Sequence, residues 1–301
     1  MDRYNKLNTF LKNKFGERVL KICVDGGFTC PNRDGKCGFG GCIFCGERGS
    51  GEHTKRTSIS DQVNKHLASY RGQRANKFVV YFQNFTNTYD TVENLKNKYD
   101  QALVSDQIVG LAIATRPDCV DEAVAQLLQS YQKKGLYVWV ELGLQTTNDK
   151  VGQLVNRGYN TQDFVNAVKV LRKHDIDIVA HIMLGLPNEE KNDLQNAIDF
   201  VNNQDIQGLK IHSTYVIENT ALADLYKSGQ YQTMQLDDYV EKVLHILQNI
   251  RPDIVVHRIT GDAPKELLLA PNWSAHKKLV LNRIENIMAT ENLTQGMYFN
   301  K

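Results

Sequence analysis

Along most of the chain, apolar runs of strand length alternate with amphipathic stretches of helix length. Six runs are continuously apolar or alternate with period 2, and they cover residues 19–24, 78–83, 108–114, 136–144, 176–186 and 208–216. The amphipathic stretches include residues 60–70, 120–133, 161–174 and 190–203, with candidate N-caps at Ser58 or Ser60, Asp118 and Thr161. Such alternation builds a parallel sheet with helices outside. The pattern predicts an α/β fold, a partial (β/α)6 TIM-like barrel, with a doubly wound sheet as the competing architecture.

The pattern changes toward the two ends of the chain. Residues 1–18 are predicted to form an N-terminal helical segment, and residues 19–217 the barrel core. After about residue 217 the chain becomes mostly helical, with one further strand-like run at 253–259. Residues 218–301 are therefore predicted to be a C-terminal extension.

Several predicted strands carry polar side chains where a buried parallel sheet should be apolar on both faces. Glu141 and Gln145 alternate with Val and Leu, His181 lies opposite Ala and Ile, and Lys210 and His212 alternate with Leu and Ile. If the apolar sets face the helices, these five side chains point into the barrel. Burying them is costly unless they are paired or bind something. A self-satisfied polar network and a ligand-lined interior both explain them, and their position near the strand ends favours the ligand.

Composition and charge narrow the setting. In 301 residues the longest apolar runs are strand-sized, far below the roughly 20 residues that cross a bilayer. The first 18 residues have no apolar signal core, so the protein is predicted to be cytoplasmic, with no membrane partner. Residues 1–77 hold 15 Lys and Arg against 7 Asp and Glu, whereas residues 78–301 hold 21 against 27. The basic third is either a solvated surface or a face that binds a polyanion.

Four of the six cysteines, Cys30, Cys37, Cys42 and Cys45, lie in one glycine-rich loop after the first predicted strand. In a reducing cytoplasm such a cluster indicates a metal rather than disulfides. Four thiolates could close a structural zinc site, whereas three could hold an iron–sulfur cluster with one iron left open. Phe44, inside the last C-x2-C, and the position of the loop at the end of a barrel strand favour iron.

The loop is similar to the lengthened cluster motif of radical S-adenosylmethionine (radical SAM) enzymes. The chain resembles the YhcC/YtqA-like group, which is related to the Elongator catalytic subunit. The resemblance spans nearly the whole chain, through the motifs KICVDGGFTCPNRDG, GGCIFCGERGSG, YFQNFTNTY, ATRPDC, ELGLQTTND, NRGY, HIMLGLP, RITGDAP and APNW. It implies that Cys30, Cys42 and Cys45 hold a 4Fe–4S cluster, and it gives Cys37 no part as a ligand.

The same resemblance implies how S-adenosyl-L-methionine binds and reacts. The open iron chelates it, and a reduced cluster cleaves it to release a 5′-deoxyadenosyl radical. The residues expected to contact it are Phe44 beside the adenine, Arg157 on the carboxylate, Gln145 on the ribose, Gln83 on the amino group and Gly185 through its backbone. Many relatives carry Gly-Gly-Glu where this chain has Gln83-Asn84, so the amino-group contact is the least defined of these.

Related enzymes act on tRNA uridines or on porphyrins. The basic N-terminal third favours RNA, so the resemblance implies a tRNA substrate modified at the wobble uridine side chain, with a flavodoxin- or ferredoxin-type electron donor. Candidate catalytic residues are Glu141, His181, Lys210 and His212. Two alternatives are a radical SAM enzyme acting on a small molecule such as a tetrapyrrole, and a non-catalytic, zinc-stabilised RNA-binding protein.

Overall fold

The centre of the protein is a curled sheet of parallel strands. The computed structural model describes residues 2–49, 51 and 57–299. The sheet has seven strands in the order β1-β2-β3-β4-β5-β6-β8, and neighbouring strands pair in parallel. Their bounds are β1 Val19–Val24, β2 Lys77–Phe82, β3 Ile108–Thr115, β4 Tyr137–Gln145, β5 Asp177–Leu184, β6 Gly208–Ser213 and β8 Val255–Arg258. This half-barrel confirms the predicted partial TIM-like barrel.

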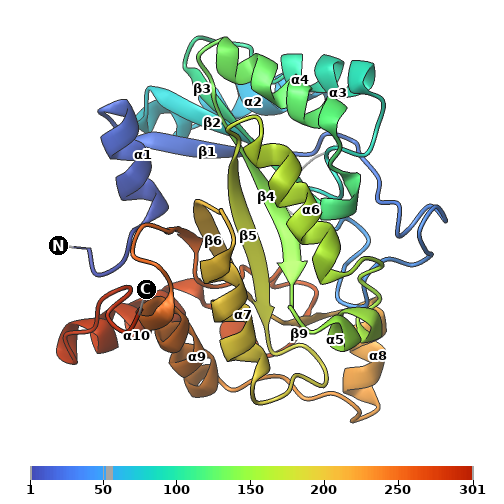
Figure 1. Cartoon of the computed structure of the whole chain (residues 1–301), viewed down its shortest axis with the longest axis vertical. Coiled ribbons are helices and arrows are strands. Elements are labelled where there is room, and N and C mark those ends of the chain that lie inside the picture. The colour runs from blue at the N-terminus through green and yellow to red at the C-terminus, as the bar shows by residue number, and fades with distance from the viewer. Residues whose placement is uncertain (1, 50, 52–56, 300–301) are drawn as a thin grey trace.

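Helices cover the outer face of the sheet, as Figure 1 shows for α3, α4, α6 and α7. The α-helices are α1 Leu7–Phe15, α2 Ile59–Leu67, α3 Val92–Asp100, α4 Glu122–Lys133, α5 Asp149–Leu154, α6 Thr161–Arg172, α7 Asp193–Asn203, α8 Ala221–Lys227, α9 Leu236–Asn249 and α10 Lys277–Thr290. Short 3-10 turns are η1 Gly72–Arg74, η2 Pro117–Cys119 and η3 Asn272–Ala275. Of the helices in the described ranges, none is long and apolar enough to cross a membrane.

The strands follow the apolar pattern closely, whereas two helix starts differ from the prediction. Ser58 caps α2 by accepting a hydrogen bond from Asp61 N, as expected. Helix α4 is capped by Asp121 rather than Asp118, because Asp118 lies in η2 and pairs with Arg116. Helix α6 is capped by Asn160 rather than Thr161, in a reciprocal capping box.

The last two predicted strands differ more from the structure. The run 208–216 is broken, so that β6 ends at Ser213 and a short strand β7, Val216–Ile217, pairs antiparallel with β9, Leu268–Ala270. The strand-like run 253–259 forms β8 and joins β6 as a seventh strand, which corrects the predicted count of six. The region after residue 217 therefore completes the sheet, and the domain boundaries at 18 and 217 stay predictions.

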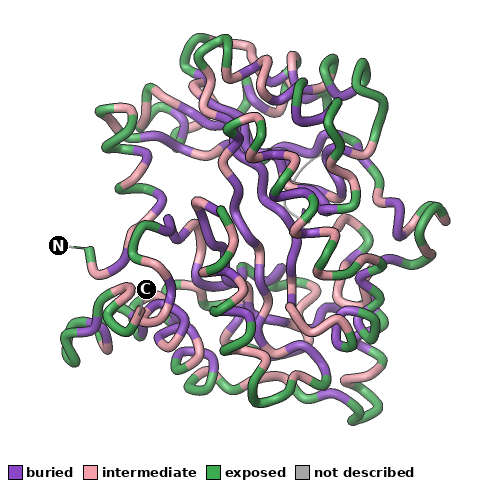
Figure 2. The backbone as a smooth tube through the Cα atoms, viewed as in Figure 1, coloured by how far each residue is buried: buried purple, intermediate pink, exposed green. Residues whose placement is uncertain are grey.

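Two apolar layers hold the half-barrel. The larger lies between the sheet and its outer helices and includes Phe82, Val140 and Ile211, each with no exposed surface. The smaller lies inside the curve, where Leu7 and Leu11 of α1 pack among residues of the strands, including Val19, Val79, Trp139, Val179 and Val255. Figure 2 shows the buried strands at the centre and the exposed positions on the outside.

The N-terminal segment lies against the edge of β8. Val256 N donates a hydrogen bond to Asn5 O (2.7 Å), and Lys6 forms a parallel bridge with Val256. Helix α1 contacts both β1 and β8, the two edge strands of the sheet. We call the opening between these two strands the seam, and the space enclosed by the curved sheet the lumen.

Candidate active site

The cysteine loop follows β1 at the carboxyl edge of the sheet. Cys42 and Cys45 lie in one tight turn, in which Cys45 N donates to Cys42 O (3.0 Å). The Cys45 thiol also donates a hydrogen bond to Cys42, which lowers the pKa of the Cys42 thiol against the effect of its burial. The guanidinium groups of Arg116 and Arg33 lower it further. Since the thiolate is the form that binds metal, this environment favours ligation.

The donor set fits a three-thiolate iron–sulfur cluster. The hydrogen bond with Cys42 and burial raise the pKa of the Cys45 thiol most, and the charge of Cys30 raises it further. The three predicted ligands therefore lie near one another. In such a cluster each thiolate binds its own iron. By contrast, no three His, Cys, Asp or Glu side chains in the described ranges converge on a single ion. Cys37 is exposed and is not among the groups that shift either Cys42 or Cys45.

The NRGY motif holds the cysteine loop in place. Asn32 Nδ2 donates to Asn156 O (2.5 Å), and Asn156 Nδ2 donates back to Gly41 O (2.7 Å). Ile43 N donates to Val155 O (3.1 Å). These bonds attach the loop to the segment that follows α5, although more than 100 residues separate the two in sequence.

Arg157, predicted to bind the cofactor carboxylate, has no exposed surface. Its guanidinium donates to Leu144 O and Thr146 O (both 2.7 Å) and to Tyr159 O (2.9 Å), and it pairs with Asp149 Oδ1 (2.7 Å). Through these partners Arg157 links the end of β4 to the NRGY turn. Contact with a cofactor carboxylate stays a prediction that this placement does not favour.

Arg116, in the ATRPDC motif, has a similar part that the sequence analysis missed. It forms a two-pronged pair with Asp118 (2.9 and 2.7 Å) and donates to Arg157 O (2.9 Å). It therefore links the end of β3 to the NRGY turn while its charge acts on Cys42. The motif was visible in the sequence, but nothing in the spacing indicated which turn the arginine reaches.

Gln145 ends β4 with a positive φ of 56°, at a register shift against β5. Its side chain folds back over Gly143, where an added Cβ would lie only 2.5 Å from Gln145 Nε2. The Tyr159 hydroxyl lies 2.6 Å from Gln145 Oε1 and 2.9 Å from Gly143 O. The glycine and the tyrosine together orient Gln145 at the carboxyl edge, where a ribose contact stays a prediction.

Phe44 lies within the cysteine loop, whereas Gln83 follows β2. The half-buried Phe44 ring packs with Val151, Val155 and Leu186, so it joins the loop to α5 and to the turn after β5. Gln83 follows β2, and its N–H donates to Val24 O (3.3 Å). Their predicted contacts with adenine and with the cofactor amino group stay predictions.

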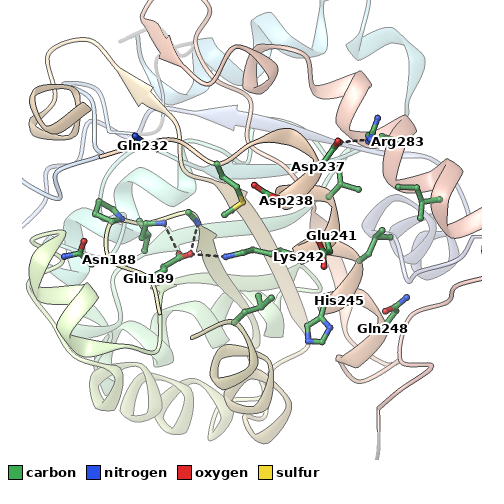
Figure 3. Close-up of a pocket in the computed structure, with 18 of the residues that line it drawn as sticks. Asn188, Glu189, Gln232, Asp237, Asp238, Glu241, Lys242, His245, Gln248 and Arg283 are labelled. Carbon is green, nitrogen blue, oxygen red and sulfur yellow. Dashed lines mark hydrogen bonds and ion pairs between the residues drawn. The ribbon is translucent and has the colours of Figure 1, made fainter. Parts of the chain in front are cut away.

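Gly185 lies in the turn after β5 with φ 85°, and its polar backbone atoms have protein partners. Its N–H donates to Glu189 Oε2 (3.0 Å), and its carbonyl accepts from the Tyr231 hydroxyl (2.6 Å). Figure 3 shows Glu189 between this turn and Lys242 of α9, whose Nζ lies 3.6 Å from the carboxylate. Burial raises the pKa of Glu189.

Behind this turn lies an open cleft of about 1150 Å³. Its walls are the segment 185–189, residues 230–234, and the facing sides of α9 and α10. Of the predicted site residues only Gly185 borders it. We therefore place the candidate active site in the lumen, where the other predicted polar residues meet.

Glu141 is the centre of a buried network in the lumen. Its side chain is 1% exposed and contacts groups from five strands. The partners are Lys210 Nζ (2.8 Å), the Tyr81 hydroxyl (2.8 Å), Trp139 Nε1 (3.4 Å), Lys21 Nζ (3.5 Å) and His257 Nδ1 (4.0 Å). Lys210 also donates to the Tyr81 hydroxyl (3.0 Å). The predicted inward orientation of Glu141 and Lys210 is therefore confirmed.

The charges in this network oppose the effect of burial. Burial favours the neutral acid, but the cations of Lys210 and Lys21 hold the pKa of Glu141 well below its usual range. Burial lowers the pKa of Lys210 to about 8. The Glu141 carboxylate acts to raise it, but the charges of Lys21 and Arg258 lower it further. Glu141 is therefore an anion shared by more than one cation, and the lumen has a surplus of positive charge.

His181 and His212 lie above this network, toward the carboxyl edge. Their ring centroids are 5.4 Å apart, and His212 Nδ1 lies 2.9 Å from Ser213 O. Burial lowers the pKa of both, to about 3 for His212, so both imidazoles are neutral at neutral pH. Within the described residues, His181 Nε2 has no hydrogen-bond partner. A neutral imidazole with a vacant nitrogen can accept a proton or bind a donor.

The structure thus brings Glu141, His181, Lys210 and His212 together, and adds residues that the sequence did not single out. These are Lys21, Tyr81, His257 and Arg258. Lys21 was hidden in a strand predicted only from its apolar positions. His257 and Arg258 were missed because β8 was assigned to an extension rather than to the barrel.

Comparisons with known proteins agree with this geometry. The sequence matches the model of the Radical SAM superfamily over residues 33–201 and that of the Radical_SAM C-terminal domain over residues 206–290. It is 39% identical over 305 residues to YtqA of Bacillus subtilis (strain 168), covering 99% of this chain and 94% of YtqA. It is 34% identical over 268 residues to YhcC of Escherichia coli (strain K12), covering 89% and 86%.

A half-barrel with a cysteine-rich loop at its carboxyl edge and these matches define the class: the chain belongs to the radical SAM superfamily. Within it, the chain belongs to the YhcC/YtqA-like group. Its fold is also similar to archaeal Methanocaldococcus infernus Elp3 lacking residues 1–46, with a TM-score of 0.68 and 18% identity over 92% of this chain and 64% of that chain. The chain is also 31% identical over 186 residues to Elongator complex protein 3 of Homo sapiens, covering 60% of this chain and 32% of that protein, which confirms the predicted relation to the Elongator catalytic subunit.

Proposed function

We propose that the protein uses a 4Fe–4S cluster and S-adenosylmethionine to modify the side chain of the wobble uridine in tRNA. Cys30, Cys42 and Cys45 would hold the cluster. Bound there, S-adenosylmethionine supplies a 5′-deoxyadenosyl radical when an electron arrives from a flavodoxin- or ferredoxin-type donor. The observation that carries the proposal is that this loop and the polar lumen share one end of the half-barrel.

The lumen residues would bind and orient the uridine side chain. Lys210 and Glu141 form a fixed ion pair at the base of the lumen (2.8 Å), with a hydrogen-bonding surface completed by the Tyr81 hydroxyl. His181 Nε2 and the neutral ring of His212 lie nearer the opening and would exchange a proton with the bound group. The curved sheet and α1 exclude water from below, because their apolar side chains fill the amino-terminal end.

Exposed aromatic and basic side chains outside the lumen favour RNA as the substrate. Phe39, in the cysteine loop, is 78% exposed, and Tyr70, beyond α2, is 79% exposed. Lys36 Nζ lies over the Tyr89 ring (5.0 Å), and the Arg74 guanidinium lies over the Tyr70 ring (5.8 Å). Exposed rings beside cations can stack on unpaired bases while the cations bind the phosphates. The basic surplus of residues 1–77 supports the same substrate.

The test combines spectroscopy with nucleoside analysis. The protein is purified without oxygen and reconstituted with iron and sulfide. It is then incubated with S-adenosylmethionine, dithionite and tRNA from a strain lacking the gene, and one substrate to include is tRNA carrying carboxymethylaminomethyluridine. We expect 5′-deoxyadenosine and a mass change confined to the wobble nucleoside. Release of 5′-deoxyadenosine with unchanged tRNA would instead point to a small substrate such as a tetrapyrrole, and a colourless zinc protein would contradict the proposal.

A further inference from the structure

The seam carries more cations than acidic side chains. Arg258 makes one hydrogen bond, from Nε to Thr260 O (2.5 Å), and no ion pair with any described residue. Lys277, the first residue of α10, has neither a hydrogen bond nor an ion pair within the described ranges. Lys21 reaches Glu141 (3.5 Å), but Lys210 already binds that carboxylate at 2.8 Å. We call Lys21, Arg258 and Lys277 the seam cations.

The seam cations face one space although they come from three separate elements. The register of the sheet sets Lys210 beside Arg258, and Lys21 lies across the lumen on β1. Burial is the main cause of the lowered pKa of Lys277, and the charge of Arg258 is the next. The exposed Asp262 opposes these two effects, while Lys21 and Arg71 add smaller effects in the same direction as Arg258.

The RITGDAP segment holds this arrangement rigidly. Gly261 packs against the ring of His212, so closely that an added Cβ would lie 2.7 Å from Cε1 of the imidazole. The Tyr239 hydroxyl donates to Ile259 O (2.8 Å), which fixes the chain one residue after Arg258. Ala263 N donates to Ser274 O (3.4 Å), and this bond ties the segment to η3, which leads into α10. The cations therefore do not move apart easily to relieve their repulsion.

Three half-buried cations with one shared carboxylate are unfavourable unless an anion joins them. The start of α10 adds to the positive potential, because its N-cap His276 makes no side-chain capping bond and its first turn holds no acidic residue. We propose that the seam binds an anionic group of the substrate, a carboxylate or a phosphate, through Arg258 and Lys277 with Lys21 beneath it. This rests on the proposed function in that the anion belongs to the substrate of the lumen.

The chemistry of the seam favours one compact anion. Arg258 offers a forked pair of donors and Lys277 a single ammonium, which together match the oxygens of one carboxylate or phosphate. The neutral His212 ring, on the strand beside β8, would add a hydrogen bond without adding charge. The anion would be either an acidic arm on the uridine base or a phosphate of the RNA backbone.

The experiment measures binding rather than turnover. The cluster-loaded protein, kept anaerobic and saturated with S-adenosylmethionine, is titrated calorimetrically with inorganic phosphate. Separate titrations use the nucleoside carboxymethylaminomethyluridine and its carboxamide, which keeps the size but removes the charge. Saturation with S-adenosylmethionine ensures that the cofactor's own carboxylate is not the anion detected.

The variants are Arg258→Met and Lys277→Met, with Lys278→Met as the matched control. Lys278 is the exposed neighbour of Lys277 in the same helical turn. We expect each seam substitution to weaken phosphate binding about tenfold, the loss of one charge-assisted contact, and Lys278→Met to leave it unchanged. Arg258→Lys should restore part of the affinity, which separates loss of charge from misfolding.

The source of the anion follows from the nucleoside titrations. Tight binding of the acid, weak binding of the carboxamide and competition with phosphate would assign the seam to the base arm. Phosphate binding without nucleoside binding would assign it to the RNA backbone. Equal affinity in all variants, or equal binding of acid and carboxamide with no phosphate binding, would overturn the proposal. If phosphate binding follows the variants while tRNA stays unmodified, only the proposed function fails.

Discussion

Arg157 and Arg258, two arginines of the candidate site, differ in how many of their hydrogen-bond donors the protein uses. Arg157, beside the cysteine loop, has no exposed surface and donates to three carbonyls and one carboxylate. Arg258, at the seam, is half-buried and makes one hydrogen bond, to a carbonyl two residues away. A guanidinium with four of its five N–H donors in use holds structure together, whereas one with most donors to spare can bind a ligand. The half of the site around the loop is a frame, and we propose that substrate recognition takes place in the half around the lumen.

Of the substitutions that test this comparison, removal of a cluster ligand should have the largest effect on cluster content and activity. We expect Cys42→Ala to lose the iron–sulfur cluster and all release of 5′-deoxyadenosine, because two thiolates do not hold the cluster. Cys37→Ala is the matched control from the same loop and should keep both. Iron content, EPR spectra and product analysis check the pair. Loss of the cluster in Cys37→Ala as well would mean that the exposed cysteine is a fourth ligand.

Loss of Arg157 should strongly lower the stability of the frame around the cysteine loop. Substitution by Met leaves buried carbonyls and the Asp149 carboxylate without their partner, so we expect a cost of about 3–5 kcal/mol in the free energy of unfolding. The surface arginine Arg283, paired with Asp237, is the control, and Arg283→Met should cost below about 1 kcal/mol. Denaturant unfolding of the cluster-loaded proteins measures both. An Arg157→Met variant of unchanged stability that bound S-adenosylmethionine poorly would restore Arg157 as a cofactor ligand.

In the lumen, Glu141→Gln should destabilise the protein by on the order of 3 kcal/mol, because it leaves Lys210 and Lys21 facing each other without an anion. The double variant Glu141→Gln/Lys210→Met removes one of the stranded charges and should recover part of that loss. Thermal unfolding of the two single variants and the double variant gives the coupling energy. If the effects of the two single substitutions on stability are additive in the double variant, the interaction between Glu141 and Lys210 contributes little to stability.

The smallest expected effect concerns pH. His212 and His257 have pKa values lowered to about 3 by burial, below the unfolded value of about 6.5. The unfolded chain therefore binds more protons between pH 6.5 and pH 3, and stability falls as the pH is lowered through that window. We expect the melting temperature of His257→Gln to fall less steeply than that of the wild type between pH 6.5 and pH 4.5. If the melting temperatures of His257→Gln and the wild type fall equally with pH, the His257 imidazole protonates as easily in the folded state as in the unfolded state.

The sequence was sufficient for the half-barrel and for much of the site. The alternation of apolar and polar positions predicted β1 to β5 and the inward orientation of Glu141 and Lys210. Successive side chains of a strand point to opposite faces, so side chains that alternate with those buried on the outer face must point inward. The spacing of Cys30, Cys42 and Cys45 gave the loop. The links formed by Arg157 and Arg116 were not predictable, since their partners are backbone carbonyls that the sequence does not distinguish.

The C-terminal strand shows a second limit. The strand-like run 253–259 was predicted but was assigned to the mostly helical C-terminal extension, so His257 and Arg258 were left outside the site. Their place depends on a pairing with β6 across more than 40 residues, and only the folded chain reveals it. The polar residues that local pattern could not place are therefore those that long-range topology brings together.

The pairing of the N-terminal segment with β8 also fixes the order in which the molecule can be completed during synthesis. Asn5 N donates to Gln295 Oε1 (2.8 Å), and Lys6 pairs with Glu285 (2.7 Å), so residues that precede β1 are bonded to residues in and after α10. These contacts form only after the C-terminal helix has left the ribosome. Until then the seam stays open while the loop of Cys30, Cys42 and Cys45 is already fully translated. The chain therefore presents the predicted cluster ligands before it can close the edge of its sheet.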